Sequence, residues 1–502
     1  MAVSDIVRVG AEKRPDETAI LFHDRPTSYA DLEEWTRRVA GGLYDLDVRK
    51  WDQVALLLGN VPEFVYGLHG IMRLGAVAVP LNPMLTPEEL GYVLADSEAR
   101  AVIVEIDELP KVLAVRDRLA SLDHVLVVGP PPTPPGTRSF DEVLDAAGEA
   151  PDPDLTDDDL ALLAYTAGTT AEPKGAMLTH GNLMANLDQL RNVPLLRGAD
   201  SDMVLLAIPL FHIYAMNAAL NLMLREGATA VLVDRFDPSE TLRLVERHRV
   251  TVLYGVPQMF QAWLAAGRRQ DFDLSSVRLA VSGAAPLPAE VLNAFLDRFG
   301  CTIWEGYGLT ETSPVVATNA LGEVAKGGSI GLPLPGLEVR LLDEDGTDAL
   351  DGDPGELLVR GPNVFRGYWN RPKETEEVFH EGWLRTGDIA YRDEDGYLHI
   401  VDRSKDLIIV SGFNVFPGEV EQAVAAHPQV EECAVVGVPD ERTGEAVKAL
   451  VVPRPGGEVT ADDLLEHCRA LLARFKLPKS VEFVDQLPRH VTGKVLRRRF
   501  RE

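Results

Sequence analysis

Positive charge, lysine and cysteine are all scarce in this chain of 502 residues. Acidic residues outnumber basic ones by 78 to 49, for a formal net charge of −29, and only 11 of the basic residues are lysines. Because nucleic-acid binding generally requires a basic face, this balance argues against a general nucleic-acid-binding protein. It does not argue against a small anionic substrate, since a cleft can be locally positive on an acidic protein.

The three cysteines, Cys301, Cys433 and Cys468, are far apart in the sequence and odd in number. This usage indicates a reducing compartment and provides neither a disulfide framework nor a metal-binding spacing. Residues 1–17 lack the basic segment followed by an apolar one that marks a secretory signal. We therefore expect a cytoplasmic protein.

The sequence also lacks a clear transmembrane segment. Residues 203–224 contain no aspartate, glutamate, lysine or arginine, and their length alone would allow a membrane helix. A proline, a histidine and two asparagines interrupt this apolar run. We therefore expect it to fold as a buried strand, turn and helix, with no transmembrane segment.

The remaining composition is typical of a soluble globular protein, with 46% apolar and 25% charged residues. Strand-like apolar runs alternate with amphipathic helical patterns, which predicts an α/β fold rich in parallel sheet. The strands expected from these runs are residues 53–59, 101–106, 124–129, 228–234, 251–256 and 278–283.

The pattern of predicted secondary structure changes twice towards the C-terminus. After Gly336, short strands and turns predict a small β-rich unit, and from residue 406 a compact α+β pattern begins. We expect a large N-terminal domain of residues 1–401, a hinge at 402–405, and a small mobile C-terminal domain of residues 406–502.

The stretch YTAGTTAEPKGAML, residues 165–178, has the composition of a phosphate-holding loop without the ending of a Walker loop. An apolar run before it predicts a strand, and the pattern after it predicts a helix. Its glycines permit close backbone approach, and its hydroxyls and single lysine suit phosphate oxygens. These groups belong to Thr166, Gly168, Thr169, Thr170, Lys174 and Gly175. The alternative is an ordinary strand-to-helix turn.

A second stretch, TIWEGYGLTETSP at residues 302–314, combines exposed backbone with an aromatic face. Gly306 and Gly308 flank Tyr307, which suits a flat nucleobase. Glu311 follows Thr310, and a carboxylate there can hold Mg²⁺ on phosphates, because this cation prefers oxygen ligands. Taken alone, the pattern is better explained by a tight turn with a solvated glutamate.

Two further candidates lie nearer the C-terminus. Asp388 follows a Thr-Gly pair and can accept hydrogen bonds from ribose hydroxyls. Asp402, Arg403 and Lys405 fall at the expected domain boundary, where charged residues are usually solvated linker. Lys494 follows a glycine near the end of the chain, among arginines that we assign to solubility.

Together and in this order, YTAGTTAEPKG, YGLTETSP, RTGD, DRSKD and TGK resemble the motifs of the adenylate-forming superfamily. This superfamily contains acyl-CoA synthetases, carrier-loading adenylation domains and luciferases. The resemblance extends from residues 27–43 to residues 492–498. It departs at Ala167, where serine or glycine is commoner, and at Ala171, which replaces a usual glycine.

The resemblance implies an ATP-dependent ligase. A carboxylate attacks the α-phosphorus of ATP, pyrophosphate leaves, and the acyl group of the adenylate then passes to the thiol of coenzyme A with release of AMP. It implies catalytic roles for Lys494, His212, Thr310 and Glu311, with Glu311 holding Mg²⁺. The nucleotide-binding residues that it implies are Thr166, Ala167, Gly168, Thr169, Thr170, Lys174, Ala284, Glu305, Gly306, Tyr307, Asp388 and Arg403.

The same resemblance implies that the small domain rotates between the two half-reactions. Lys405 matches the hinge position, and Lys494 should matter for adenylation and little for thioester formation. The segment that begins at Ser411, Gly412 and Phe413 would then form part of the tunnel for coenzyme A.

The acyl pocket is also assigned from matching positions. These residues are mostly small and apolar, and none is a lysine or arginine, which makes a dicarboxylate unlikely to bind. They are His212, Tyr214, Met216, Ala218, Val281, Ala284, Gly306, Pro314 and Val315. Without the resemblance, His212 would be interpreted as a core histidine.

The identity of the acid stays open between two classes. PKGAMLTHGNL and SGFNVFPGEVE resemble fatty acyl-CoA synthetases, whereas FHIYAMN resembles plant-type hydroxycinnamate-CoA ligases. We expect a medium- or long-chain fatty acid, with an aromatic acid as the alternative. A stand-alone adenylation enzyme that loads a separate carrier protein is a third possibility, and the sequence leaves a homodimer open. A non-catalytic scaffold is disfavoured because Lys494, Glu311 and Asp388 are all present.

Overall fold

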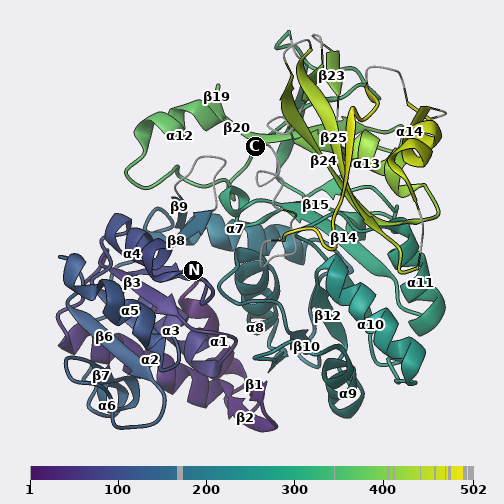
Figure 1. The fold of residues 1–502 in the computed structure, drawn as a ribbon. Helices are drawn as coiled ribbons and strands as arrows, with labels where there is room; N and C mark the ends of the chain where they lie inside the picture. The colour runs from purple at the N-terminus through teal and green to yellow at the C-terminus, as the bar shows by residue number, and fades with distance from the viewer. Residues whose placement is uncertain are drawn as a thin grey trace. The chain divides into compact units, whose positions relative to one another are not determined.

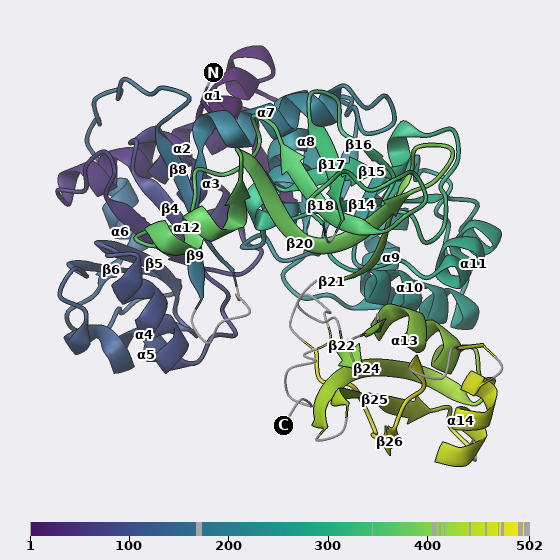
Figure 2. The ribbon, with the colours of Figure 1, turned by 90° about the horizontal axis from the view of Figure 1, so that it is seen from above.

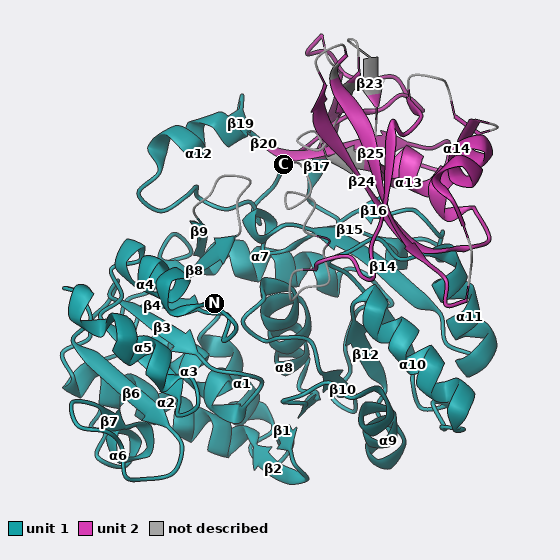
Figure 3. Cartoon of the chain, in the orientation of Figure 1, with its two compact units in different colours: residues 1–338, 360–384 teal, residues 339–359, 385–502 magenta. Residues whose placement is uncertain are grey.

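The computed structural model describes residues 2–166, 173–343, 345–403, 408–410, 413–415, 417–440, 443–456, 459–469, 471–472, 476–489 and 495. They form two compact units, which Figure 3 colours separately. Unit 1 comprises residues 1–338 and 360–384, and unit 2 comprises residues 339–359 and 385–502. The expected α/β class with parallel-rich sheets is confirmed.

The first sheet of unit 1 has seven strands in the order β7-β6-β5-β3-β4-β8-β9 (Figure 1). All neighbours are parallel except the hairpin of β8 and β9. The strands are β3 (Gln53–Leu57), β4 (Val77–Pro80), β5 (Ala101–Glu105), β6 (His124–Val128), β7 (Arg138–Ser139), β8 (Leu160–Thr166) and β9 (Lys174–Thr179).

Helices cover both faces of this sheet. Figure 2 shows α2 (Tyr29–Asp45) and α3 (Pro62–Arg73) on one side, and α4 (Pro87–Asp96) and α5 (Leu109–Val115) on the other. Successive residues of β3 divide between two separate hydrophobic cores, because side chains alternate across a strand. Because both faces of the sheet are buried, its strands consist of near-continuous apolar runs.

The second sheet of unit 1 has nine strands in the order β16-β15-β14-β13-β12-β10-β11-β1-β2. Its centre is parallel, and β2, β15 and β16 are antiparallel to their neighbours. The strands are β1 (Thr18–Phe22), β2 (Arg25–Ser28), β10 (Met203–Leu206), β11 (Thr229–Leu232), β12 (Val252–Gly255), β13 (Leu279–Ser282), β14 (Ile303–Gly308), β15 (Val315–Thr318) and β16 (Leu332–Pro333).

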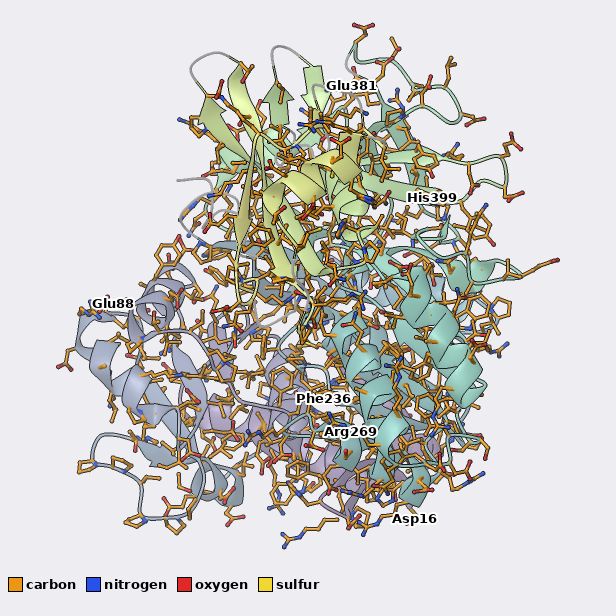
Figure 4. The ribbon with its side chains drawn as sticks, turned by 45° about the vertical axis from the view of Figure 1, so that its right-hand side comes forward. Asp16, Glu88, Phe236, Arg269, Glu381 and His399 are labelled. Carbon is orange, nitrogen blue, oxygen red and sulfur yellow. The ribbon has the colours of Figure 1, made fainter. Side chains whose placement is uncertain are left out.

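Different helices face the two sides of this second sheet. On one side, the row of α9 (Pro238–His248), α10 (Pro257–Arg269) and α11 (Ala289–Phe299) in Figure 1 packs through aromatic side chains. Trp263 is central there: the ring of Phe236, labelled in Figure 4, meets it edge-on with 5.6 Å between centroids. On the other side, Tyr214 contacts Tyr254 of β12 at 6.0 Å between ring centroids.

The remaining elements of unit 1 connect these layers. They are α1 (Asp5–Lys13), η1 (Arg116–Arg118), α6 (Phe140–Asp145), α7 (His180–Arg191), η2 (Tyr214–Asn221), α8 (Leu222–Glu226), η3 (Thr310–Thr312), η4 (Asn319–Leu321), α12 (Pro372–Val378) and β19 (Phe379–His380). Helices α2, α4 and α7 each begin with a reciprocal capping box, which satisfies backbone donors that a helix start leaves unpaired.

Unit 2 contains most of the sheet formed by β17 (Glu338–Leu342), β18 (Gly355–Arg360), β20 (Trp383–Arg392) and β21 (Leu398–Arg403), in which β20 and β21 are antiparallel. The boundary with unit 1 crosses β17, β18 and β20. His399, labelled in Figure 4, stacks on Tyr391 at 4.7 Å between centroids and lies 2.8 Å from a carboxylate oxygen of Asp393. These strands match the β-rich unit that the sequence predicts after Gly336.

The last part of unit 2 has its own hydrophobic core, built from Ile408, Val435, Val447, Leu464 and others. Its sheet has the order β23-β22-β25-β24, with β26 parallel to β25. Its elements are β22 (Ile408–Val410), β23 (Phe413–Val415), α13 (Pro417–Ala425), β24 (Val430–Asp440), β25 (Gly444–Pro453), α14 (Ala461–Arg469) and β26 (Ser480–Phe483). The hinge at 402–405 stays a prediction, since residues 404–407 lie outside the described residues.

Two local expectations from the sequence need correction or refinement. The helix predicted after the phosphate-type stretch is confirmed as α7, but the last residues of the stretch form strand β9, which pairs with β8 as a hairpin. Residues 203–224 do form a buried strand, turn and helix, but most of the helix is the wide π-helical stretch η2. In the part of the chain that the structure describes, no helix is long and apolar enough to cross a membrane.

Asn60 connects the two sheets of unit 1. It follows β3 of the first sheet, and its side chain is 5% exposed. Its amide nitrogen donates to the carbonyls of Ile208 (2.9 Å) and Val233 (3.1 Å), beyond the ends of two strands of the second sheet. Its amide oxygen accepts from the backbone nitrogen of Leu210 (2.8 Å). A single buried amide therefore satisfies backbone groups of two segments, one after β10 and one after β11.

We predict that Asn60→Ala lowers the free energy of unfolding by about 2–4 kcal/mol, because it leaves buried backbone groups without partners. Urea unfolding followed by tryptophan fluorescence measures this. Asn293→Ala is the matched control, since Asn293 is exposed within α11 and alanine favours the helix. Equal stability of the two variants would contradict the prediction.

Candidate active site

Tyr368 brings two of the predicted site residues together. The ammonium of Lys174, at the start of β9, lies 5.4 Å from the centroid of the Tyr368 ring. The hydroxyl of the same tyrosine donates to a carboxylate oxygen of Glu311 at 2.7 Å. Burial raises the pKa of Tyr368 above its ordinary value, so its hydroxyl keeps its proton and remains a donor. The candidate phosphate and metal residues thus meet at one aromatic side chain.

The backbone around Tyr368 runs between β9 and the turn that carries Glu311. Met177 of β9 donates to the carbonyl of Gly367 (2.9 Å) and accepts from Arg366 (3.0 Å). Phe365 donates to the carbonyl of Glu311 (2.8 Å). Main-chain hydrogen bonds therefore fix the segment that supplies Tyr368 against both motifs.

Buried amide side chains hold the turn between β14 and β15. Asn186 of α7 exchanges two hydrogen bonds with the backbone of Val315, at 2.9 and 3.1 Å. Asn363 donates to the carbonyl of Thr312 at 2.7 Å, and Asn217 of η2 donates to that of Ser313 at 2.7 Å. The three asparagines are each at most 2% exposed, so the turn has little freedom to move.

Gln189 joins these amides into a network. It accepts from Asn186 at 3.1 Å and donates to Asn363 at 3.2 Å. Gly308 starts the same turn, where a side chain would meet the carbonyl of Pro314 at 2.0 Å. Gly306 has room for a Cβ, whose nearest neighbour would be 3.7 Å away. Of the two glycines that the sequence singled out, only Gly308 is therefore required by a close backbone approach.

Tyr214 occupies the carboxyl ends of β12 and β13, the edge where parallel sheets usually bind ligands. Its hydroxyl donates to the carbonyl of Val281 (3.1 Å) and lies 3.4 Å from that of Gly255. Its ring packs against Gly283, where a Cβ would be 3.1 Å from the ring. Burial raises the pKa of Tyr214 well above its ordinary value, so it stays a neutral donor.

The other predicted pocket residues lie on the same elements. Met216 and Ala218 are buried in η2, Gly306 is in β14, and Pro314 precedes Val315 at the start of β15. Ala284 follows β13 with a left-handed backbone, φ +69°. His212 precedes η2, and its Nδ1 lies 3.4 Å from the backbone nitrogen of Tyr214. The π-helical geometry of η2 is a form often found at functional sites.

Glu305 on β14 is 5% exposed and accepts a hydrogen bond from the backbone nitrogen of Leu287 at 3.1 Å. Burial raises the pKa of Glu305 to about 8, against the opposing effect of that hydrogen bond. Its carboxyl group is therefore mostly protonated at neutral pH and can donate a hydrogen bond as well as accept one. Tyr307 and Thr310 follow on the same strand and turn.

The remaining predicted residues lie in unit 2 or outside the described residues. Asp388 of β20 is 3% exposed, and its backbone nitrogen donates to the hydroxyl of Thr386 at 3.1 Å. It pairs in register with Arg403 of β21. Phe413 is in β23. Ala167, Gly168, Thr169, Thr170, Lys405, Ser411, Gly412 and Lys494 lie outside the described residues.

A Mg²⁺ site built from protein side chains alone is not found in the described part of the chain, which contains no cluster of three histidine, cysteine, aspartate or glutamate residues. Glu311 supplies a single carboxylate there. That donor set fits Mg²⁺, since this cation is usually bound by one or two carboxylates together with substrate phosphates and water.

Sequence reasoning missed Tyr368 and the amide network. The only signal for Tyr368 was an aromatic residue next to a glycine, Gly367, in a segment that read as an irregular loop. The amides gave no signal, because each has its partners in a distant segment: 129 residues separate Asn186 from Val315.

Known protein families match two successive parts of the chain. Residues 7–369 match the AMP-binding enzyme family, and residues 419–494 match the C-terminal domain of AMP-binding enzymes. A feruloyl-CoA synthase of Amycolatopsis sp is 43% identical over 498 residues, 98% of this chain and 97% of that protein. A long-chain-fatty-acid–CoA ligase of Yersinia pestis is 40% identical over 516 residues, 97% of this chain and 92% of that protein.

Solved structures are similar over the whole chain. An anthranilate CoA ligase in complex with anthranoyl-AMP has a TM-score of 0.91 at 31% identity, covering 100% of this chain and 96% of that one. A benzoate CoA ligase from Burkholderia xenovorans LB400 has a TM-score of 0.88 at 32% identity and covers 100% of both chains.

We predict that Glu305 makes the protein less stable as the pH rises from about 4.5 to about 8. The folded state holds a proton there that the unfolded state releases, because the pKa of Glu305 is raised to about 8. The loss across this window is at most about 5 kcal/mol. Urea unfolding from pH 5 to 8.5 should show that Glu305→Gln removes this slope. Glu290→Gln, at an exposed position of α11, should keep it; parallel profiles for all three proteins would contradict the prediction.

Proposed function

The chain belongs to the AMP-binding enzyme family and is an AMP-forming acyl-CoA ligase, and from this premise we propose that its acid substrate is an aromatic, hydroxycinnamate-like carboxylic acid. ATP and coenzyme A are the other substrates of such ligases. The fatty acid that the sequence favoured is the second candidate.

The observation that carries the choice of an aromatic acid is the fixed position of Tyr214. Its ring is held between Gly283 and Tyr254, and its hydroxyl is bound to the carbonyl of Val281. A ring held in this way limits the depth of the pocket and offers a flat surface, which suits another aromatic ring better than a long alkyl chain. The similarity to a feruloyl-CoA synthase and to anthranilate and benzoate CoA ligases supports the same choice.

Two observations also support a fatty acid as the substrate. Met216, Ala218 and Val315 make the predicted pocket apolar, and apolar pockets discriminate weakly between acids, since one methylene is worth only about 1–3 kcal/mol. The long-chain-fatty-acid–CoA ligase of Yersinia pestis, 40% identical, points in that direction.

In the first half-reaction, the acid carboxylate attacks the α-phosphorus of ATP and pyrophosphate leaves. We assign the β- and γ-phosphates to Thr166, Lys174 and the intervening residues, where hydroxyl groups and one cation can stabilise the charge that develops on the leaving group. Tyr368 keeps the Glu311 carboxylate oriented through its hydroxyl. Glu311 would hold Mg²⁺, which would neutralise phosphate charge when bound.

The adenosine moiety and the principal cation are assigned from the family resemblance. Asp388 and Arg403 would bind the ribose, and Glu305, Gly306, Tyr307 and Ala284 would border the adenine. Lys494 would contact the reacting phosphate and carboxylate in the first half-reaction only.

In the second half-reaction, the thiol of coenzyme A attacks the acyl carbonyl of the adenylate, a tetrahedral intermediate collapses, and AMP leaves. The hinge at Lys405 and the segment from Ser411 to Phe413 would serve this step. A carrier protein as acceptor is the alternative to free coenzyme A. The two half-reactions, as proposed, use residues of one chain and do not require a second copy.

The function is tested by AMP and pyrophosphate release with ATP, Mg²⁺ and coenzyme A, across cinnamate-type acids, benzoates and fatty acids of graded length. We expect thioester formation to peak with a cinnamate-type acid. Lys494→Ala should slow adenylation by about 10²–10³-fold, because it removes a preorganised transition-state charge, and leave thioester formation from a supplied acyl-adenylate within about threefold. A peak with fatty acids would replace the aromatic assignment, and no turnover with any acid would overturn the function.

We also predict that Tyr214→Ala raises the ratio of kcat/KM for a long-chain fatty acid over that for a cinnamate-type acid by at least about tenfold, since it deepens the pocket and removes the flat surface. Tyr254→Phe is the matched control, because its hydroxyl has no hydrogen-bond partner among the described residues and its ring is kept. An unchanged ratio in Tyr214→Ala would show that this ring does not set the depth of the pocket.

A further inference from the structure

One carboxylate, that of Asp96 at the end of α4, is bound from two sides close to the candidate phosphate residues. Its Oδ2 accepts from the hydroxyl of Tyr165 at 2.7 Å, and Tyr165 is the residue before Thr166 at the end of β8. Its Oδ1 accepts from the guanidinium of Arg371 at 2.7 Å. The carboxylate is 11% exposed, so solvent screens this ion pair only partly.

Arg371 continues this chain of contacts to the start of β9. Its guanidinium donates to the hydroxyl of Tyr92 at 3.1 Å, and that hydroxyl donates to the carbonyl of Pro173 at 3.2 Å. Pro173 is the residue before Lys174. Asp96 therefore reaches both sides of the connection between β8 and β9, directly at Tyr165 before it and through Arg371 and Tyr92 at Pro173 after it.

Trp369 makes a second connection between the end of α4 and the start of β9. Its indole nitrogen donates to the carbonyl of Asp96 at 3.1 Å, and its backbone nitrogen donates to the carbonyl of Gly175 at 2.8 Å. The ring of Tyr165 lies over Gly175, where a Cβ would be 3.1 Å from that ring. The two residues are also partners in the strand register, as are Thr166 and Lys174 beyond them.

The chemistry proposed for the enzyme does not use this cluster, which contains no group assigned to a substrate. It does determine where Thr166 and Lys174 lie relative to α4 and to the segment of Tyr368. Arg371 makes the cluster sensitive to charge, because removal of the carboxylate leaves the partly buried guanidinium with only the more distant Glu374, at 4.0 Å, as an ionic partner among the described residues.

We propose that Asp96 is a positioning residue for the triphosphate end of ATP, acting through the end of β8 and the start of β9. The proposal rests on the proposed function, since it takes Thr166 and Lys174 to contact the β- and γ-phosphates. Its effect is confined to ligands that carry those phosphates. AMP and the acyl-adenylate lack them, so their binding does not depend on Asp96.

The first measurement is equilibrium binding of ATP with Mg²⁺, and of AMP, to the full chain and to Asp96→Asn. This variant keeps an acceptor for the Tyr165 hydroxyl and removes the charge that holds Arg371. We expect the Kd for ATP to rise about tenfold, as for the loss of one charge-assisted contact worth about 1.4 kcal/mol, and the Kd for AMP to stay the same. Tyr165→Phe, which removes only one hydroxyl, should shift ATP in the same direction by about threefold.

Asp159→Asn is the matched control at the opposite end of the same two strands. Asp159 precedes β8, is 9% exposed, and accepts from Lys50 and from the indole nitrogen of Trp51, at 3.0 and 3.1 Å. Like Asp96 it is a largely buried carboxylate paired with one cation, it also accepts two hydrogen bonds from Thr156, and it lies far along the strands from Thr166. We expect it to lower the free energy of unfolding without changing the ratio of the Kd for ATP to that for AMP.

The second measurement separates the two half-reactions. Asp96→Asn should raise the KM for ATP about tenfold, leave the KM for the acid and for coenzyme A unchanged, and leave thioester formation from a supplied acyl-adenylate unchanged. Equal losses in both half-reactions, equal weakening of ATP and AMP, or the same shift in Asp159→Asn would overturn the proposal.

A failure of the proposed function can be distinguished from a failure of the positioning role of Asp96. In that case the parent protein activates no acid, whereas the binding measurement still reports whether Asp96 separates ATP from AMP. A tenfold change in the Kd for ATP alone would then support the positioning role in a protein with a different reaction, and no change would remove it.

Discussion

The turn between β14 and β15 is held by buried amide side chains, and the rest of the candidate site depends on that restraint. Asn186 of α7, Asn217 of η2 and Asn363 of the loop after β18 bind backbone groups of the turn. A buried amide that loses its partners costs free energy, so the network is satisfied in one arrangement of those elements and in few others. Glu311 is thereby fixed before any substrate is bound, and both its carbonyl and its carboxylate receive hydrogen bonds from the segment of residues 365–368.

Three neutral donors lie among the candidate site residues of unit 1. Tyr368 and Tyr214 are partly buried and Glu305 is buried, and desolvation raises the pKa of each above its ordinary value. Each group therefore presents a proton at neutral pH where an ionised side chain would repel an anionic substrate. Donors that carry no charge suit a chain that has a net charge of −29 and only 11 lysines.

The two half-reactions of an acyl-CoA ligase need different contacts from one protein. Pyrophosphate departs in the first, so groups that hold the β- and γ-phosphates matter only then, whereas the acyl pocket and the adenosine contacts serve both. The residues proposed for these tasks lie on different elements of unit 1: Asp96 binds Tyr165 at the end of β8, and Tyr214 binds the carbonyl of Val281 in β13.

The sequence by itself determined the alternation of strands and helices, the candidate residues Lys174, Glu311 and Tyr214, and the resemblance to adenylate-forming enzymes, because periodicity and motifs are local properties. It did not predict β9, whose six residues are too short to separate strand from helix by pattern. It could not predict the π-helical form of η2, which depends on packing. Only the tertiary structure decided the partners of those residues: 57 residues separate Tyr368 from Glu311, and 275 separate Arg371 from Asp96. Hydrogen bonds between side chains so far apart in the chain leave no periodic trace, since each requires only that the fold bring two groups within about 3 Å.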